Sequence, residues 1–380
     1  MAELTHPDAS LPRLPPNLDG HHGSNRGRHG IRQIVADTDI EAFRIWLAEY
    51  ASSPHTLRSY RKEALRLLIW ATRMQRKPVS SLTREDLLAY EVFLTSPPAD
   101  WVDAERPRHG ADRRLFAGPL SPRSVRQAMG ILSGLFNYLV AAGYLAGSPL
   151  ALRRQRNHGV SRRSAVERYL SQDLWQFVLD FIDTLPQATV RDRQHYERAR
   201  WLFRLLYGAA LRASEVAQAK AGDLYQRRGR WWLAVVGKGG VAGDIPIGEA
   251  LMADFARYRE FHRLPGLPLP DESTPLVMSI AGATDRPLTA TSIYLVVKEV
   301  FRRAADALES RNPAGATTLR NASTHWLRHT SASHQADAGN DIRHIQKNLR
   351  HASIETTAIY LHAEDDRRHA ETTGTRRRDA

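Results

Sequence analysis

Residues 324–360 read THWLRHTSASHQADAGNDIRHIQKNLRHASIETTAIY, and this stretch decides the architecture around it. Its apolar spacing predicts one helix over 323–338 and a second over 342–349, followed by a short segment that ends at Tyr360. His351 comes two residues after the end of the second helix and stands nine residues before Tyr360. A lone tyrosine in a helical segment is usually a core residue, so its chemistry has to be judged with the rest of the chain.

The first of these two helices carries several side chains that bind anions or transfer protons. His325 and Arg328 are three residues apart and therefore share one helix face. His325 and His329 are four apart, which also matches a helical zinc pair. No glutamate follows His325 and no third ligand is evident, so we reject the zinc metalloprotease interpretation and predict no metal site.

A break between two helices places another arginine among apolar residues. The sequence from Gly208 to Glu215 reads GAALRASE, and a helix of large apolar residues ends at Gly208 while a new helix begins near Ala213. Arg212 lies at this break. An arginine between buried helices either forms a salt bridge, here with Glu215, or serves an anion, and the sequence leaves both roles open.

Two β-type runs, 230–237 and 243–247, are joined by a glycine-rich turn that contains Lys238. This turn is not a phosphate-binding loop, because Trp232 and Gly239 stand where that motif needs a glycine and a Ser or Thr. A lysine at a hairpin tip is usually an exposed turn residue. In a cleft, Lys238 could instead reach a phosphate as a mobile proton donor.

Composition narrows the classes of protein that this chain can form. It has 380 residues, with 54 Lys and Arg against 41 Asp and Glu and a formal net charge of +13, which favours a polyanionic partner. On charge alone, a basic soluble protein without such a partner stays an alternative. The absence of cysteine excludes disulfides, cysteine nucleophiles and thiolate metal sites. No apolar run approaches the roughly 18 residues of a membrane span, and no signal segment is evident, so we expect neither a membrane nor a secreted protein.

Pattern changes along the chain predict two domains, which is what a length of 380 residues favours. We expect a flexible tail over 1–35, a helical domain over 36–150, a basic linker over 151–168, a mainly helical domain with a small antiparallel sheet over 169–365, and a tail over 366–380.

The helices outside 324–360 are predicted from apolar spacing and from capping residues. In the first domain we expect helices over 40–50 and 56–73, two more with Thr83 and Ser121 as N-caps, and a loop or insertion over 96–119. In the second domain we expect a helix that is capped by Ser171 and ends at 185, and further helices over 191–211, 250–262 and 290–308.

Taken together, these motifs resemble, in order and spacing, the tyrosine recombinase (phage integrase) family. The resemblance rests on A-L-R-x-S-E at Arg212, G-K-G-G at Lys238, H-x-x-R-H-T at His325, and L-x-H-A-S-x-x-T-T-x-x-Y ending at Tyr360. The segment DIRHIQK over 341–347 also looks like the family. The fold implied is a two-domain DNA clamp, with a helical core-binding (SAM-like) domain and an α+β catalytic domain.

The resemblance implies a site-specific recombinase or integrase that cuts and rejoins DNA through a covalent 3′-phosphotyrosyl link, without metal, ATP or any other cofactor. It assigns the nucleophile to Tyr360, which must lose a proton of pKa near 10 as it attacks and so needs cationic surroundings. The implied partners of the nucleophile are the phosphate-binding Arg212 and Arg328, the proton donor Lys238, the proton-transfer residue His325, the phosphate-binding His351, and Glu215, which orients the cluster.

Two departures from the family pattern stand out. Arg350 occupies the position before His351 where the family usually has glycine; if that position is a left-handed helix cap, arginine costs on the order of 1 kcal/mol there, and otherwise the turn takes another form. It also adds a positive charge beside the site. The loop over 96–119 is longer than in simple members.

The expected partner is double-stranded DNA, bound with strong salt dependence by basic side chains. The candidates are Arg58, Arg61, Lys62, Arg66, Arg123, Arg126, Arg153 and Arg154. The family implies a homotetramer on paired DNA sites, an accessory directionality factor, and action on the nucleoid in a prokaryotic cytoplasm. Two alternatives remain: a catalytically inactive DNA-binding protein with the recombinase fold, and a type IB-like DNA-relaxing enzyme.

Overall fold

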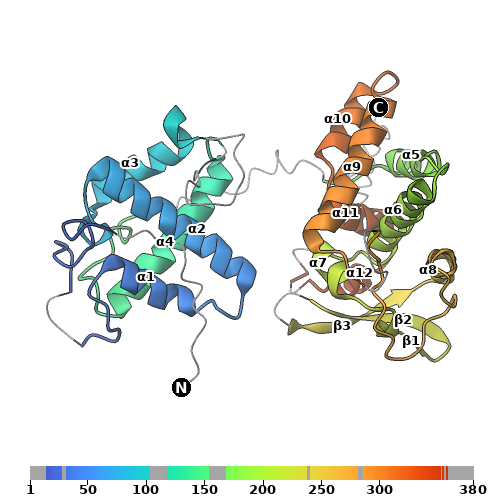
Figure 1. The fold of residues 1–380 in the computed structure, drawn as a ribbon, viewed down its shortest axis with the longest axis horizontal. Helices are drawn as coiled ribbons and strands as arrows, with labels where there is room; N and C mark the ends of the chain where they lie inside the picture. The colour runs from blue at the N-terminus through green and yellow to red at the C-terminus, as the bar shows by residue number, and fades with distance from the viewer. Residues whose placement is uncertain are drawn as a thin grey trace, which may run out of the picture. The chain divides into compact units, whose positions relative to one another are not determined.

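The computed structural model describes residues 14–27, 31–102, 116, 118–153, 168–237, 240–280, 286–351, 353, 354 and 357. The chain forms two compact units, Met1–Gly159 and Val160–Ala380 (Figure 1). The break between the units falls inside the basic stretch 151–168. No helix in the described ranges is long and apolar enough to cross a membrane.

In its described residues, the first unit is built from four α-helices. They are α1 (Asp39–Ala48), α2 (Pro54–Trp70, continued by a π-turn over Ala71–Gln75), α3 (Arg84–Thr95) and α4 (Pro122–Ala141). Two of the helices begin at the predicted caps: the side chain of Thr83 accepts the Asp86 N–H, and that of Ser121 accepts the Ser124 N–H. Large aromatic side chains such as Trp46, Trp70 and Phe136 are buried where the helices meet.

The predicted flexible tail is wrong for residues 14–27, which pack on the first unit. Arg26 is only 8% exposed, lies over the ring of Tyr144 at 3.9 Å, and donates a hydrogen bond to the carbonyl of Asp37 at 2.8 Å. Leu18 is buried as well. The segment has no apolar periodicity because polar contacts and a cation–π contact hold it, and these leave no periodic signal. Residues 1–13 and 28–30 lie outside the described residues.

The ends of the predicted loop over 96–119 contribute to the core. Trp101 and Phe116 are buried and both contact the ring of Phe93 edge to face, with centroid distances of 5.0 and 5.6 Å. Residues 103–115 and 117 lie outside the described part of the chain.

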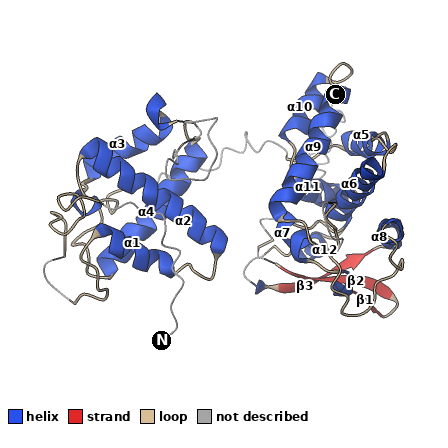
Figure 2. Cartoon of the chain, viewed as in Figure 1, coloured by secondary structure: helices blue, strands red, loops and turns tan. Residues whose placement is uncertain are grey.

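The second unit combines helices with one three-stranded antiparallel sheet, which lies at one end of the unit (Figure 2). The strands β1 (Leu224–Arg227), β2 (Arg230–Val236) and β3 (Ala242–Ile247) are ordered β1-β2-β3, with Leu233 of β2 opposite both Leu224 and Ile245. The helices are α5 (Gln172–Asp183), α6 (Val190–Gly208), α7 (Ala213–Gln218), α8 (Glu249–Phe261), α9 (Ala290–Leu308), α10 (Pro313–Asn321), α11 (Thr324–Asp337) and α12 (Ile342–Leu349).

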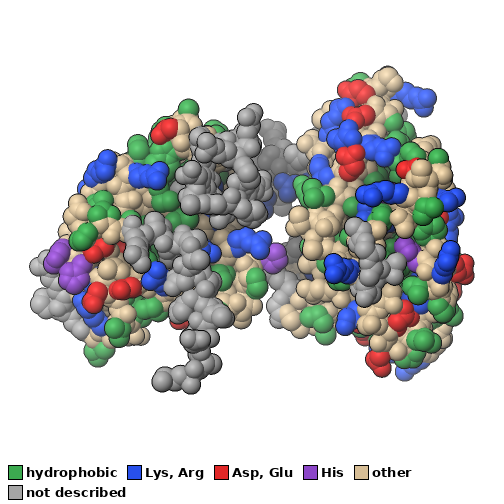
Figure 3. All heavy atoms as spheres, viewed as in Figure 1, with side chains coloured by type: hydrophobic (Ala, Val, Ile, Leu, Met, Phe, Trp, Pro, Cys, Tyr) green, Lys and Arg blue, Asp and Glu red, His purple; other side chains and the backbone are tan. Residues whose placement is uncertain are grey.

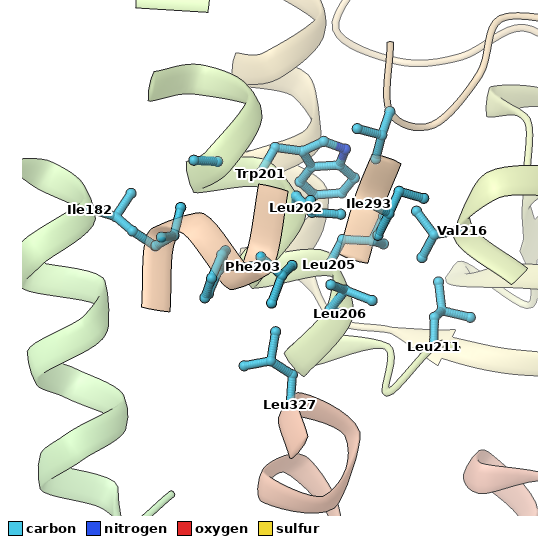
Figure 4. Close-up of a cluster of buried hydrophobic side chains, with 14 of the residues drawn as sticks. Ile182, Trp201, Leu202, Phe203, Leu205, Leu206, Leu211, Val216, Ile293 and Leu327 are labelled. Atoms are coloured by element: carbon cyan, nitrogen blue, oxygen red, sulfur yellow. The ribbon is translucent and has the colours of Figure 1, made fainter. Parts of the chain in front are cut away.

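The core of the second unit includes the residues that directly precede two motif arginines. Figure 4 shows apolar side chains of α6 gathered with Ile293 of α9 and Leu327 of α11. Leu211 and Leu327 are 1% and 0% exposed, and each directly precedes a motif arginine, Arg212 or Arg328. Packing of these two leucines therefore fixes the backbone from which both arginines project.

Candidate active site

The break after α6 is a left-handed turn whose backbone binds an arginine of another helix. Helix α6 ends at Gly208, and Ala210 has a φ of 47° before α7 begins at Ala213. A left-handed alanine costs about 1–2 kcal/mol, so the turn must be held by its surroundings. The carbonyl of Ala210 accepts a hydrogen bond of 2.7 Å from Arg328 Nη1.

A second left-handed turn ends α12. Arg350 has φ 53° and ψ 46°, which is the helix-cap conformation that glycine normally adopts. The turn therefore keeps the geometry of the usual glycine, at a cost on the order of 1 kcal/mol. Arg328 Nη2 donates to the carbonyl of Leu349, just before this cap. The Arg328 side chain is 1% exposed and bridges the carbonyls of two turns that are far apart in the sequence.

One buried carboxylate, Glu215, collects three arginines. Its Oε2 accepts the backbone N–H of Arg212 at 2.7 Å and Arg350 Nη2 at 2.5 Å, while Oε1 accepts Arg212 Nη1 at 2.7 Å. Arg328 Nη1 lies 3.9 Å from Oε2. Burial alone would raise the pKa of Glu215, but the Arg212 N–H and the charge of Arg350 outweigh it, so this pKa is lowered and the group is ionised.

Arg212 forms the salt bridge that the sequence allowed, and part of its side chain stays exposed. Its salt bridge with Glu215 holds one end of the guanidinium, yet 31% of its side chain is exposed, so it can also meet an anion from solvent. We call Arg212, Glu215, His325, Arg328, Arg350 and His351 the basic cluster.

His325 and His329 are both kept neutral near pH 7. Their rings meet edge to face with centroids 4.2 Å apart. Loss of surrounding water and the nearby charges of Arg328 and Arg212 lower the pKa of His325. Burial, the adjacent His325 and Arg328 lower the pKa of His329 to about 3. Among the described residues, no three histidine or acidic side chains come together as metal ligands.

His351 is oriented by a residue that the sequence analysis did not single out. Its Nδ1 lies 3.0 Å from Oγ1 of Thr357, which is 1% exposed. A hydroxyl that donates to Nδ1 leaves the ring proton on Nε2, which can then donate to a phosphate oxygen. Burial, then Arg328 and Arg212, lower the pKa of His351 to about 4. The sequence feature that could have indicated this contact is the pair of threonines, Thr356 and Thr357, in the last motif.

Two predicted site residues, Lys238 and Tyr360, lie outside the described residues. The hairpin on either side of Lys238 is closed by a 2.7 Å hydrogen bond from the Gly237 N–H to the Val241 carbonyl. The structure therefore brings together Arg212, Glu215, His325, Arg328 and His351, and adds Arg350 to them.

Five of the predicted DNA-contacting side chains lie at the surface of the first unit. Arg58 and Lys62 of α2 and Arg123 and Arg126 of α4 are exposed, and Arg61 is half-buried. Figure 3 shows Lys and Arg side chains spread over the visible face of each unit, interrupted by acidic ones.

Arg66 and Arg153 are instead engaged within the first unit. Arg66 is buried, pairs with Glu63 at 3.2 Å and lies over the ring of Phe116 at 4.5 Å. Arg153 donates from Nε to Glu91 at 3.0 Å. Arg154 lies outside the described residues.

A helical unit with a three-stranded sheet and a buried carboxylate that gathers arginines beside neutral histidines is suited to one class of proteins, those that bind a phosphate group. Comparison with known proteins narrows this class. The model of the phage integrase family matches residues 175–367. A tyrosine recombinase XerC of Chromohalobacter salexigens is 31% identical over 288 residues, which cover 73% of this chain and 83% of that protein.

Two further comparisons agree. The tyrosine recombinase XerC of Chlorobaculum parvum is 27% identical over 297 residues, covering 73% of this chain and 83% of that protein. The integrase of transposon Tn1549, solved in complex with transposon right end DNA, shares the fold with a TM-score of 0.59 at 16% identity, over 87% of this chain and 98% of that one. The chain belongs to the phage integrase family and is a tyrosine-type site-specific recombinase, an enzyme that cleaves and rejoins DNA.

Proposed function

We propose that the chain exchanges DNA strands at a specific site through a 3′-phosphotyrosyl intermediate, with Tyr360 as the nucleophile and the basic cluster as the phosphate-binding site. The observation that supports this most is the sharing of Glu215: one carboxylate holds Arg212 and Arg350 and lies 3.9 Å from Arg328, so positive charge exceeds negative charge there. A site with excess buried cations is stabilised when an anion enters.

In the proposed step, Tyr360 Oη attacks the scissile phosphorus while the bond from phosphorus to the 5′ oxygen breaks. Arg212 and Arg328 neutralise the charge on the non-bridging oxygens, which is the task that a metal ion performs in other phosphoryl-transfer sites. The proton of the tyrosine passes to His325, and Lys238 supplies a proton to the leaving 5′ oxygen. The phosphotyrosyl ester keeps the energy of the broken bond, so a 5′-hydroxyl from another strand can rejoin the DNA.

The protonation states of the histidines support these roles. The lowered pKa of His325 keeps its ring neutral at pH 7, as a proton acceptor must be. His351 is neutral as well, and in the tautomer whose Nδ1 accepts from Thr357, Nε2 carries the proton that can bond to a phosphate oxygen.

We infer that the first unit binds duplex DNA with the exposed Arg58, Lys62, Arg123 and Arg126 of α2 and α4, together with the half-buried Arg61. Arg66 and Arg153 act inside the unit instead. The DNA complex of the transposon integrase supports a DNA-bound working state. By family analogy the active assembly is a homotetramer on paired sites, aided by a directionality factor, on the nucleoid of a prokaryotic cell.

The experiment that tests this function is rapid denaturing capture of protein-linked DNA from cells that express the wild type or Tyr360→Phe, followed by sequencing. We expect reads from one short inverted repeat with the wild type alone, because the phenylalanine side chain has no oxygen to form the ester. Covalent DNA from both proteins would assign the nucleophile elsewhere. No covalent DNA from either would point to a binding protein without turnover.

A plasmid assay separates recombination from simple relaxation. Purified wild type is incubated with a supercoiled plasmid that carries the captured sequence and with one that lacks it. We expect strand exchange only with the first plasmid, whereas equal relaxation of both would favour a type IB-like enzyme.

A further inference from the structure

Arg350 departs from the family pattern and sits inside the basic cluster. Its backbone takes the left-handed conformation that glycine would adopt without strain. Its N–H still closes the cap by bonding to the carbonyl of Lys347 at 3.1 Å. The arginine side chain is therefore carried at a position where the backbone disfavours it, and its contacts show what it does there.

The side chain of Arg350 is buried between three elements. It is 8% exposed; Nη2 binds Glu215 of α7 at 2.5 Å, and Nη1 binds the carbonyl of Asn348 at 3.0 Å. Its aliphatic part covers Gly243 of β3, where an added Cβ would lie 3.0 Å from Cδ of Arg350. Its buried Nε has no hydrogen-bond partner in the described part of the chain. Because Gly243 has no side chain, the Arg350 side chain can occupy the space beside β3.

The contact with Glu215 changes the charge of the cluster. Oε2 of Glu215 is shared between Arg350 and the Arg212 N–H, and only Oε1 binds the Arg212 guanidinium. With Arg328 beside them, three guanidinium groups face one carboxylate, which gives a net charge of +2. Glycine at 350 would leave +1. A phosphodiester carries one negative charge, but the five-coordinate transition state that a phenolate forms with it carries two.

We propose that Arg350 is a positioning residue for strand cleavage. It binds Oε2 of Glu215, so the negative charge of this carboxylate neutralises Arg212 and Arg328 less. These two arginines then present more positive charge to the transition state. This rests on the proposed roles of Arg212 and Arg328. The effect favours the transition state over the bound substrate, because the extra cation matches charge that develops only during attack. It therefore acts on the rate of cleavage more than on DNA affinity.

The test compares single-turnover cleavage by wild type, Arg350→Gly and Arg350→Asn. The substrate is a nicked duplex that carries the sequence recovered by covalent capture. Both variants suit a left-handed backbone, so both should fold. We expect about a tenfold slower cleavage with DNA affinity nearly unchanged. Arg343→Ala removes the same charge from an exposed position on the same helix, and should cleave within about twofold of wild type.

A second substrate distinguishes an electrostatic effect of Arg350 from a structural effect of its replacement. A methylphosphonate at the scissile position replaces one charged oxygen by a methyl group, so the transition state carries one negative charge fewer. We expect the defect of Arg350→Gly to shrink to about twofold on this substrate. Equal defects on both substrates, or wild-type cleavage of the ordinary phosphodiester, would overturn the proposal.

A third measurement does not depend on cleavage and separates this proposal from the proposed function. Arg350 is one of the charges that lower the pKa of His351. An NMR titration of the His351 ring should show a higher pKa in Arg350→Gly than in wild type, while Arg343→Ala leaves it in place. An unchanged pKa of His351 in Arg350→Gly would show that this charge does not reach the site, whatever DNA the protein cleaves.

Discussion

At the scale of single residues, the histidines of the site make the stability of the protein depend on pH. Burial and neighbouring cations lower the pKa of His329 to about 3 and of His351 to about 4. An unfolded histidine titrates near 6.5, so below that pH the unfolded chain binds more protons than the folded one. The free energy of unfolding should therefore fall as the pH decreases from about 6.5 toward 4, and stay level with respect to these groups above 6.5.

The prediction is checked by urea unfolding of wild type and His329→Gln between pH 7.5 and 5. His329 should account for about 1–2 kcal/mol of the loss between pH 6.5 and 5, so the variant should show a shallower slope by that amount. His344→Gln, which removes an exposed histidine of α12, is the matched control. Parallel slopes for wild type and His329→Gln would contradict the assignment.

At the scale of elements, helix α11 carries residues of the site and also binds the start of the second unit. It carries His325 and Arg328 in its first two turns, and further along Thr330 and His334 both bind Leu170. Thr330 Oγ1 accepts the Leu170 N–H at 3.0 Å, and His334 Nε2 donates to the Leu170 carbonyl at 2.9 Å. The helix that presents His325 and Arg328 is thus fixed near the start of the second unit.

Replacing His334 by phenylalanine should loosen this attachment. The ring stays of similar size, but the buried carbonyl of Leu170 and the hydroxyl of Tyr207, 2.9 Å from Nδ1, lose their partner. We expect a loss of about 1–3 kcal/mol in the free energy of unfolding, measured with urea, and faster hydrogen exchange at residues 168–170. His344→Phe introduces the same ring at an exposed position and serves as the control. Equal stability of His334→Phe and wild type would show that these hydrogen bonds contribute nothing.

The sequence predicts elements well where their signals are local. The helices capped by Thr83, Ser121 and Ser171 begin where those residues indicate, because an N-cap and the residues it bonds are adjacent in the chain. Strand β1 was missed, since four residues are too few to show a period. Helix α10 was also missed, although Asn312 and Pro313 form an ordinary N-terminal signal.

The sequence could not predict those features of the site that depend on long-range contacts. The family resemblance assigned Arg212, His325, Arg328 and His351 to one site, and these residues lie together in the structure, but the partner of Arg350 is Glu215, 135 residues earlier in the chain. The direction of Arg66 is also set from a distance, because Phe116 supplies the ring over which it lies. Periodicity reports which face of a helix is apolar, and not which charge a distant segment will bring to it.

At the scale of the whole molecule, a net charge of +13 implies that DNA affinity depends steeply on salt. Each phosphate contact that a cation makes contributes about 0.9 to the slope of log affinity against log salt concentration. Arg58 and Lys62 of α2 and Arg123 and Arg126 of α4 are exposed. Lys62 also pairs with Glu63 at 2.9 Å, so replacing all four by alanine should lower the slope by about 3 units, roughly 0.9 for each of Arg58, Arg123 and Arg126.

The measurement is fluorescence anisotropy of a labelled random-sequence duplex, titrated with protein at several salt concentrations. Random sequence isolates contacts to the backbone, because base readout is absent. Arg302→Ala is the control: this arginine of α9 is also exposed, but Glu299 and Asp306 hold it at 2.6 and 2.8 Å, so its removal should leave the slope within experimental error. If the fourfold variant kept the wild-type slope, the DNA grip of the first unit would have to lie elsewhere, on residues other than α2 and α4.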